Sequence, residues 1–149
     1  MIQKFFLADD DEDDCAMFRE ALIDIDSSLR LDHAKNGREL FVKLQDPDVW
    51  PEIIFLDVNM PEMNGWECLT MLKADQALSG IPVILYSTSS AKIYGKKAMD
   101  NGAIGFYEKP TSFQHFRAFL EAITETSQEQ LVKTLKELMA TRIHAVYTE

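Results

Sequence analysis

The sequence predicts an α/β domain built on a doubly wound parallel sheet of five strands, with helices on both faces. Three short runs, residues 5–8, 53–56 and 83–86, are wholly apolar, which is typical of parallel strands buried on both faces. Segments with helical spacing of apolar residues lie between these runs, so strands and helices alternate. A length of 149 residues suits one domain with a short appendage.

Two further strands and five helices complete the expected alternation. Residues 29–34 alternate in polarity and predict an edge strand, and residues 103–107 predict a fifth strand. Asn64-Gly65 should start the third helix, Gly102 should end the fourth, and Thr111 or Ser112 should cap the fifth. The helices are marked by Phe18, Leu22 and Ile25; by Leu40, Phe41 and Leu44; by Trp66, Leu69 and Leu72; by residues 90–101; and by Phe113, Phe116, Leu120 and Ile123.

Residues 127–149 form a separate unit of the expected organisation. Leu131, Leu135, Leu138 and Met139 lie on one helical face, so we divide the chain into a domain over 1–126 and a C-terminal helical extension over 127–149. The extension is too short for a DNA-binding domain, and the sequence does not indicate its role. Its apolar stripe favours packing within the chain over a dimer seam, and a homodimer remains the alternative.

Charge and cysteine content exclude several classes of protein. The formal net charge is −10, and six of the acids form the single run 9–14, without which it would be −4. This balance argues against binding nucleic acid or an anionic membrane surface. Cys15 and Cys68 make no disulfide framework, the N-terminal apolar stretch is too short for a secretion signal, and no run is long enough to span a membrane. We therefore expect a cytoplasmic protein.

Polar side chains follow the predicted strands, at the point where each one ends. Asp9 and Asp10 follow the first strand, Asp57 the third, Ser87 the fourth and Lys109 the fifth. The carboxyl ends of parallel strands share one edge, where ligands bind. Carboxylates on adjacent strands, ~4.8 Å apart, would repel one another, and Mg²⁺ with oxygen ligands would relieve that repulsion.

The same residues suggest chemistry on phosphorus. Asp57, at a strand end beside a metal, could attack phosphorus and form an acyl phosphate. Lys109 could pair with a phosphoryl oxygen, and Ser87 could donate a hydrogen bond to another.

Four motifs in order resemble the receiver domains of response regulators over roughly residues 3–125. The resemblance implies a flavodoxin-like sheet with strand order 2-1-3-4-5. Within this family, the sequence is similar to the chemotaxis regulator and closer to the single-domain phytochrome-associated regulators. The motifs are Leu7-Ala8-Asp9-Asp10; Asp57-Val58-Asn59-Met60-Pro61-Glu62-Met63-Asn64-Gly65; Pro82-Val83-Ile84-Leu85-Tyr86-Ser87; and Lys109-Pro110.

The resemblance also implies roles for individual residues. Asp57 would accept a phosphoryl group from a sensor histidine kinase or phosphotransfer protein. Asp10 and Asp57 would ligate Mg²⁺ through side chains, Asn59 through its backbone carbonyl, and Asp9 mostly through water. Lys109 would contact the phosphoryl group, with a cis peptide bond before Pro110.

A switch is implied as well, in which Ser87 moves toward the phosphoryl group and Phe106 turns inward. Thr88 is larger than the residue usual in relatives, which would hinder that rotation. The remaining acids, Asp11 to Asp14, are interpreted as a solvated segment, and His33, His115 and His144 as structural residues.

The expected function is that of a stand-alone response regulator in a two-component or phosphorelay system. It would signal by phosphorylation-dependent binding of a protein whose identity the sequence does not give, or by onward phosphotransfer. It would catalyse only its own phosphorylation and dephosphorylation. One alternative is an adaptor that is never phosphorylated. The other is an aspartyl-phosphate phosphatase, which would instead carry its nucleophile after the first strand in a D-x-D motif.

Overall fold

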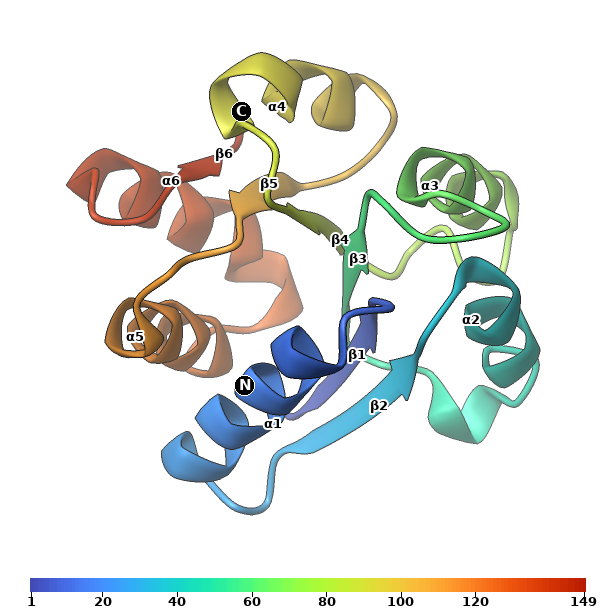
Figure 1. The fold of residues 1–149 in the computed structure, drawn as a ribbon, viewed down its shortest axis with the longest axis horizontal. Coiled ribbons are helices and arrows are strands. Elements are labelled where there is room, and N and C mark those ends of the chain that lie inside the picture. Colours follow the sequence, from blue (N-terminus) through green and yellow to red (C-terminus); the bar gives the residue numbers. More distant parts are fainter.

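Strands and helices alternate along most of the chain, as the sequence predicts. The computed structural model describes residues 1–149, and Figure 1 shows its elements in chain order. The strands are β1 (Lys4–Ala8), β2 (Arg30–Ala34), β3 (Ile53–Asp57), β4 (Val83–Ser87), β5 (Gly105–Glu108) and β6 (Val146–Tyr147). The α-helices are α1 (Glu12–Ile25), α2 (Gly37–Lys43), α3 (Gly65–Ala74), α4 (Ala91–Asp100), α5 (Phe113–Thr124) and α6 (Leu131–Thr141), with 3₁₀ turns at Pro47–Val49 and Gln128–Gln130.

The sheet has the order β2-β1-β3-β4-β5-β6. Its first five strands are parallel, so the predicted fold class and strand order are confirmed. The strand at residues 30–34 lies at the edge, where its alternating pattern placed it. Because β1 and β3 are neighbours, with Ala8 paired to Leu56, the residues that follow them emerge side by side.

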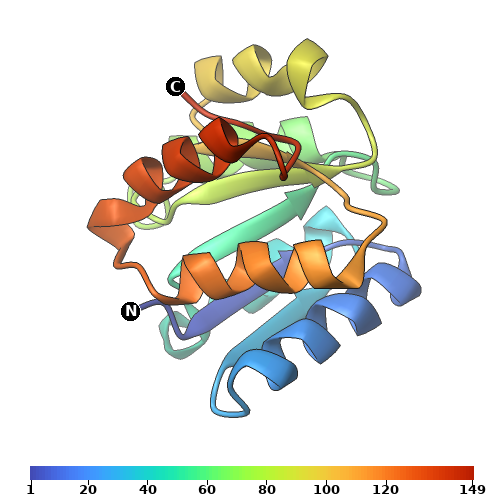
Figure 2. The same ribbon diagram turned by 90° about the vertical axis from the view of Figure 1, so that its left-hand side faces the viewer.

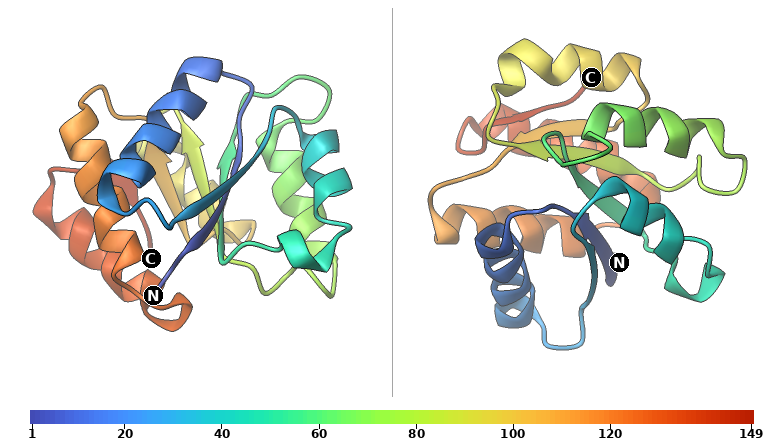
Figure 3. Two further views of the ribbon diagram at one scale, coloured as in Figure 1. Left: turned by 90° about the horizontal axis from the view of Figure 1, so that it is seen from below. Right: turned by 45° about the vertical axis from the view of Figure 1, so that its right-hand side comes forward.

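Helices cover both faces of the sheet, and each face has its own apolar core. Figures 2 and 3 show α1, α5 and α6 on one side, with α2 and α3 on the other. Successive residues of β1 point to opposite faces, so Phe5 packs with the first group of helices and Phe6 with the second. Phe18 of α1 anchors the first core, with edge-on contacts to Phe55 and Phe116 at ring-centre distances of 5.1 and 5.3 Å.

The helix starts follow the capping chemistry in the sequence. Asp11, Asn36, Asn64, Ser90 and Ser112 each accept a hydrogen bond from a backbone N–H in the first turn of the helix that follows. Of the two caps considered for α5, the structure uses Ser112. The expected end of α4 is also confirmed, because Gly102 has a φ of 98°, a conformation that glycine adopts without steric cost.

The C-terminal segment packs on the domain and adds a strand that the sequence analysis did not anticipate. Leu131 and Leu135 are buried in the core beneath α6, so the apolar stripe does pack within the chain. After α6, β6 pairs antiparallel with β5, matching Val146 to Tyr107 and Tyr147 to Phe106. The sheet therefore has six strands. None of the helices has both the length and the apolar character needed to cross a membrane.

Candidate functional site

Three carboxylates converge at the carboxyl edge of the sheet. Asp9 and Asp10 directly follow β1, and Asp57 ends β3. One side-chain oxygen from each lies within 4.8 Å of the other two. Asp9 is fully buried and Asp57 is 5% exposed, whereas Asp10 is exposed. The sheet order thus brings together side chains that are nearly fifty positions apart in the sequence.

Lys109 reaches this cluster from the end of β5. Its Nζ lies 2.8 Å from Asp9 Oδ2, 2.8 Å from Asp14 Oδ2 and 3.7 Å from Asp57 Oδ2. The Lys109 backbone N–H donates to the Ser87 carbonyl at 2.7 Å, which anchors the residue beside β4. Burial lowers the pKa of the Lys109 ammonium, but Asp14, Asp9 and Asp57 outweigh it and hold the pKa above its ordinary value.

Asp14 is a member of the site that the sequence analysis missed. Asp11 is exposed and caps α1 by accepting hydrogen bonds from the N–H groups of Asp13 and Asp14. The prediction that residues 11–14 form a solvated segment is wrong for Asp14, because its carboxylate pairs with Lys109. A signal was present: Asp14 lies four positions before the buried Phe18, so it shares that face of α1. Because all six positions from 9 to 14 are acidic, the helical spacing of Asp14 does not stand out from its neighbours.

Asp57 lies where a negative charge is costly. Burial, followed by the adjacent charge of Asp9, raises the pKa of the Asp57 carboxyl to about 7, although Lys109 and the Asn59 N–H oppose the change. A buried group of like charges gains stability from any cation that enters it. Lys109 supplies one positive charge to three carboxylates within 4 Å, so the cluster carries excess negative charge.

The loop after β3 folds back closely on the end of the strand that carries Asp57. Gly65 donates its N–H to the Val58 carbonyl at 2.8 Å. A Cβ at position 65 would lie 2.3 Å from the Asp57 carbonyl oxygen, so this close approach requires glycine. Glu62 adopts a φ of 67°, and Asn64 closes a capping box with Glu67. The turn thus starts α3 where the sequence predicts.

Ser87 ends β4, the strand paired with the β3 strand of Asp57, and Phe106 lies one strand further along the sheet, on β5. Ser87 is fully buried, and its hydroxyl accepts from the Ser89 N–H at 3.1 Å. Phe106 is fully buried and stacks on Tyr94 with ring centres 6.4 Å apart. Asn59 is exposed, and its N–H donates to Asp57 Oδ1 at 3.4 Å. The roles assigned to these residues stay predictions.

One implication of the resemblance is wrong, because no peptide bond in the structure is cis. The bond between Lys109 and Pro110 is therefore trans.

The donor set fits a hard divalent cation. Only oxygen ligands are offered, from two buried carboxylates and one exposed one, and this is the ligand type that Mg²⁺ prefers. Asp9 Oδ2 is buried and has Lys109 as its charged partner, and the exposed Asp10 leaves the cluster open on the solvent side.

Comparison with known proteins agrees with this geometry. The family model described as the response regulator receiver domain matches residues 5–121. The chain belongs to the response regulator receiver family. It is 31% identical over 94 residues to the chemotaxis protein CheY1 of Helicobacter pylori, covering 63% of this chain and 75% of that one. Receiver domains act in two-component signalling, where they typically interact with histidine kinases and downstream effectors, and generally bind Mg²⁺ at an acidic pocket.

Other relatives are much longer proteins. Histidine kinase P4 of Formosa agariphila is 36% identical over 92 residues, covering 62% of this chain and 7% of the kinase. A protein-glutamate methylesterase/protein-glutamine glutaminase of Treponema denticola is 38% identical over 127 residues, covering 80% of this chain and 32% of that enzyme. The receiver chain thus spans less than a third of either relative, and it is similar to the methylesterase only through the receiver domain of that enzyme.

Solved structures show the same fold. The phosphorylated cyanobacterial phytochrome response regulator RcpA is 25% identical, with a TM-score of 0.73 over 84% of this chain and 93% of that one. The chemotaxis response regulator CheY4 of Vibrio cholerae is 24% identical, with a TM-score of 0.65 over 92% and 98%.

Proposed function

We propose that this receiver is a stand-alone response regulator that is phosphorylated on Asp57, with Mg²⁺ bound by the adjacent carboxylates. The donor would be the phosphohistidine of a sensor histidine kinase or of a phosphotransfer protein, in the cytoplasm. One observation carries the proposal: Lys109 Nζ lies 3.7 Å from Asp57 Oδ2, inside a cluster of buried carboxylates at the sheet edge.

The transfer requires Asp57 to be ionised. A carboxylate oxygen attacks phosphorus, an O–P bond forms, and the P–N bond of the phosphohistidine breaks with its electron pair passing to the imidazole nitrogen. Bound Mg²⁺ would neutralise charge on the phosphoryl oxygens. It would be held by Asp10 and Asp57 through their side chains, by the Asn59 carbonyl, and by Asp9 through water. Because the pKa of Asp57 is raised, a nearby cation would also favour the reactive, ionised form.

Lys109 is in position to contact the product. Its side chain is 9% exposed and its ammonium lies close to Asp57, so a phosphoryl oxygen added to that carboxylate would lie within reach without movement of β5. The same ammonium is held by Asp9 and Asp14, which keep it extended into the site. This arrangement positions a charge before the reaction instead of recruiting it during the reaction.

The phosphoryl group would be read out through β4 and β5. The Ser87 hydroxyl, which accepts from the Ser89 N–H, would donate its hydrogen to a phosphoryl oxygen, and Phe106, already buried against Tyr94, would shift with β5. Phosphorylation would shift an existing equilibrium between two states by its differential interaction with each. The output would be binding of a downstream protein or onward phosphotransfer. In this proposal residues 1–126 form the receiver and residues 127–149 an extension that completes the sheet edge.

Phosphorylation is tested by incubating the protein with acetyl phosphate and Mg²⁺ and measuring its intact mass. We expect one phosphoryl group per chain, lost in Asp57→Asn and on adding EDTA. Asp48→Asn is the matched control, because Asp48 is exposed and lies outside the site, and it should label normally. Trp66, beside Tyr94 at 6.4 Å, gives a fluorescence signal for the same reaction.

The outcomes separate this proposal from its alternatives. An unlabelled wild-type protein would favour an adaptor that is never phosphorylated. Labelling retained in Asp57→Asn would place the acceptor elsewhere. Rapid hydrolysis of small phosphate esters would favour a phosphatase, although the acceptor carboxylate ends the third strand and not the first.

A further inference from the structure

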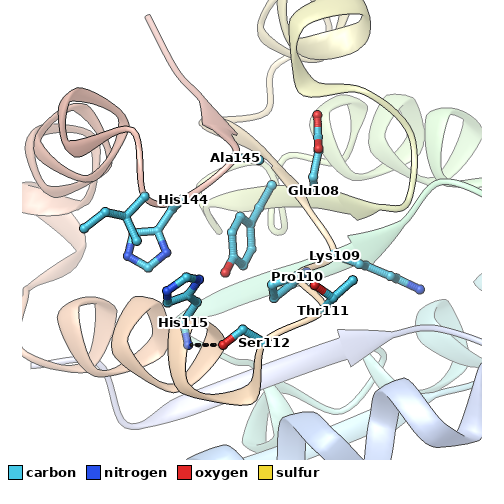
Figure 4. A pocket seen from close by; sticks show the side chains of 10 residues that line it. Glu108, Lys109, Pro110, Thr111, Ser112, His115, His144 and Ala145 are labelled. Atoms are coloured by element: carbon cyan, nitrogen blue, oxygen red, sulfur yellow. Dashed lines mark hydrogen bonds between the residues drawn. The ribbon is translucent and has the colours of Figure 1, made fainter.

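A second group of polar side chains lies near the phosphorylation site but outside its chemistry. A hollow of about 290 Å³ opens between the end of β5, the start of α5 and the segment that follows α6. Figure 4 shows the side chains that line it, including two histidines. The Lys109 ammonium extends away from this hollow, toward its partners Asp9 and Asp14.

His115 and His144 approach each other across this hollow from distant parts of the chain. His115 is exposed in the first turn of α5, where its backbone N–H donates to the Ser112 hydroxyl at 3.2 Å. His144 precedes β6. The two ring centres are 6.3 Å apart with the rings inclined at 78°, and the imidazoles lie next to each other in Figure 4.

The hollow also contains buried polar atoms that have no partner. His144 Nδ1 is buried without a hydrogen bond, and the Tyr107 hydroxyl, on a residue that is 1% exposed, is also unpaired. Both residues line the hollow. Buried polar groups in folded proteins nearly always have a partner, so two unpaired atoms in one hollow point to a ligand that supplies one.

The charge state of His144 suits a metal ligand. Burial, with a smaller contribution from His115, lowers the pKa of the His144 imidazole. A neutral imidazole keeps a nitrogen lone pair available, which metal coordination requires and which a phosphate or sulfate ion would not use. The Phe119 ring, 5.5 Å from His144 between centres, shields one side of this imidazole from water.

We propose that His115 and His144 together bind one borderline transition-metal ion of the Zn²⁺ type, with water completing its coordination. Zn–N bonds of ~2.1 Å in a tetrahedral site place two ligating nitrogens about 3.4 Å apart. Rings with centres 6.3 Å apart approach this arrangement when the exposed His115 side chain rotates. The Tyr107 hydroxyl would hydrogen-bond a water molecule on the metal. The site shares no side chain with the carboxylates that would bind Mg²⁺.

Such a metal ion would fasten the C-terminal segment to the receiver. The segment is held here by short backbone pairing, with Glu108 N–H donating to the Ala145 carbonyl at 2.8 Å and Val146 paired with Tyr107. A bond from α5 to residue 144 would hold β6 at the edge of β5. Metal binding would therefore slow opening of β6.

Calorimetric titration of the full chain with Zn²⁺, in excess Mg²⁺ to occupy the carboxylates, tests the proposal. We expect one Zn²⁺ per chain. His115→Ala and His144→Ala should each weaken the affinity by at least the roughly 10–100-fold lost when a supporting residue of a metal site is removed. His33→Gln is the matched control, because His33 lies instead beside Cys15 and the Asp9 carbonyl. It and Asp57→Asn should bind Zn²⁺ as the wild type does.

Hydrogen exchange gives a second measurement, which reports on the pairing of the C-terminal segment with β5 instead of on the heat of binding. Zn²⁺ should slow exchange of the Glu108 amide in the wild type and leave it unchanged in His115→Ala. His115 is exposed, so this variant should fold even if His144→Ala does not. Wild-type affinity in His115→Ala, or loss of binding in His33→Gln or Asp57→Asn alone, would overturn the proposal.

Discussion

Replacing Asp57 by asparagine should make the metal-free protein more stable at pH 8. The substitution keeps the shape of the side chain and removes a buried negative charge from the cluster that contains Asp9 and Asp10. In the wild type, the pKa of Asp57 is raised from 3.8 to about 7. The folded protein therefore holds this proton more tightly than the unfolded chain does.

The sign of the pH dependence follows from that direction. The contribution of Asp57 to stability is fully present below its unfolded pKa of 3.8 and is lost as the pH rises to about 7. At about 1.4 kcal/mol for each pKa unit, the loss has an upper limit of about 4 kcal/mol. Because Asp9 and Asp57 interact strongly, we expect Asp57→Asn to be more stable than the wild type by about 2–4 kcal/mol at pH 8. For a chain of this size, that difference corresponds to roughly 4–16 °C in melting temperature.

Urea unfolding in EDTA at pH 5 and pH 8, followed by circular dichroism, measures this difference. The free energy of unfolding of Asp57→Asn should exceed that of the wild type, and the difference should be larger at pH 8 than at pH 5. Millimolar Mg²⁺ should stabilise the wild type more than the variant. Asp48→Asn should match the wild type at both pH values. An Asp57→Asn protein that is no more stable than the wild type at pH 8, with an equal response to Mg²⁺, would refute the proposed carboxylate repulsion.

Three other substitutions test the parts that surround Asp57. Lys109→Gln removes the cation from three carboxylates and should lower the free energy of unfolding in EDTA by about 3–5 kcal/mol, measured by urea unfolding. An unchanged urea midpoint would contradict the buried ion pairs. Asp14→Asn should lower stability by only about 1–2 kcal/mol, because Asp14 is partly exposed, and should slow labelling by acetyl phosphate; equal labelling rates would leave Asp14 without a role in holding Lys109. Gly65→Ala should displace the loop after β3, because its Cβ would meet the Asp57 carbonyl. The variant should be less stable and should bind Mg²⁺ more weakly in titrations. Normal Mg²⁺ affinity would argue against the close approach of Gly65 to the Asp57 carbonyl.

Much of the fold could be derived from residue patterns. The runs at 5–8, 53–56 and 83–86 lack polar residues because their strands are covered on both faces, and this burial leaves a direct signature in sequence. The caps of α3 and α5 were predicted because Asn and Ser bond to backbone groups only a few positions away. Parallel strands place Asp10, Asp57 and Lys109 at one edge of the sheet, but their closeness also requires β1 beside β3, an order that only the family resemblance implied.

Contacts that depend on the relative placement of remote segments could not be derived in this way. Strand β6 has two residues, too few to show a period, and pairs with β5 because α6 carries the chain back to the sheet edge. Asp14 meets Lys109 across 95 positions, and His115 meets His144 only after that same return. Local preferences act over a few residues, whereas these contacts depend on how whole helices pack against the sheet.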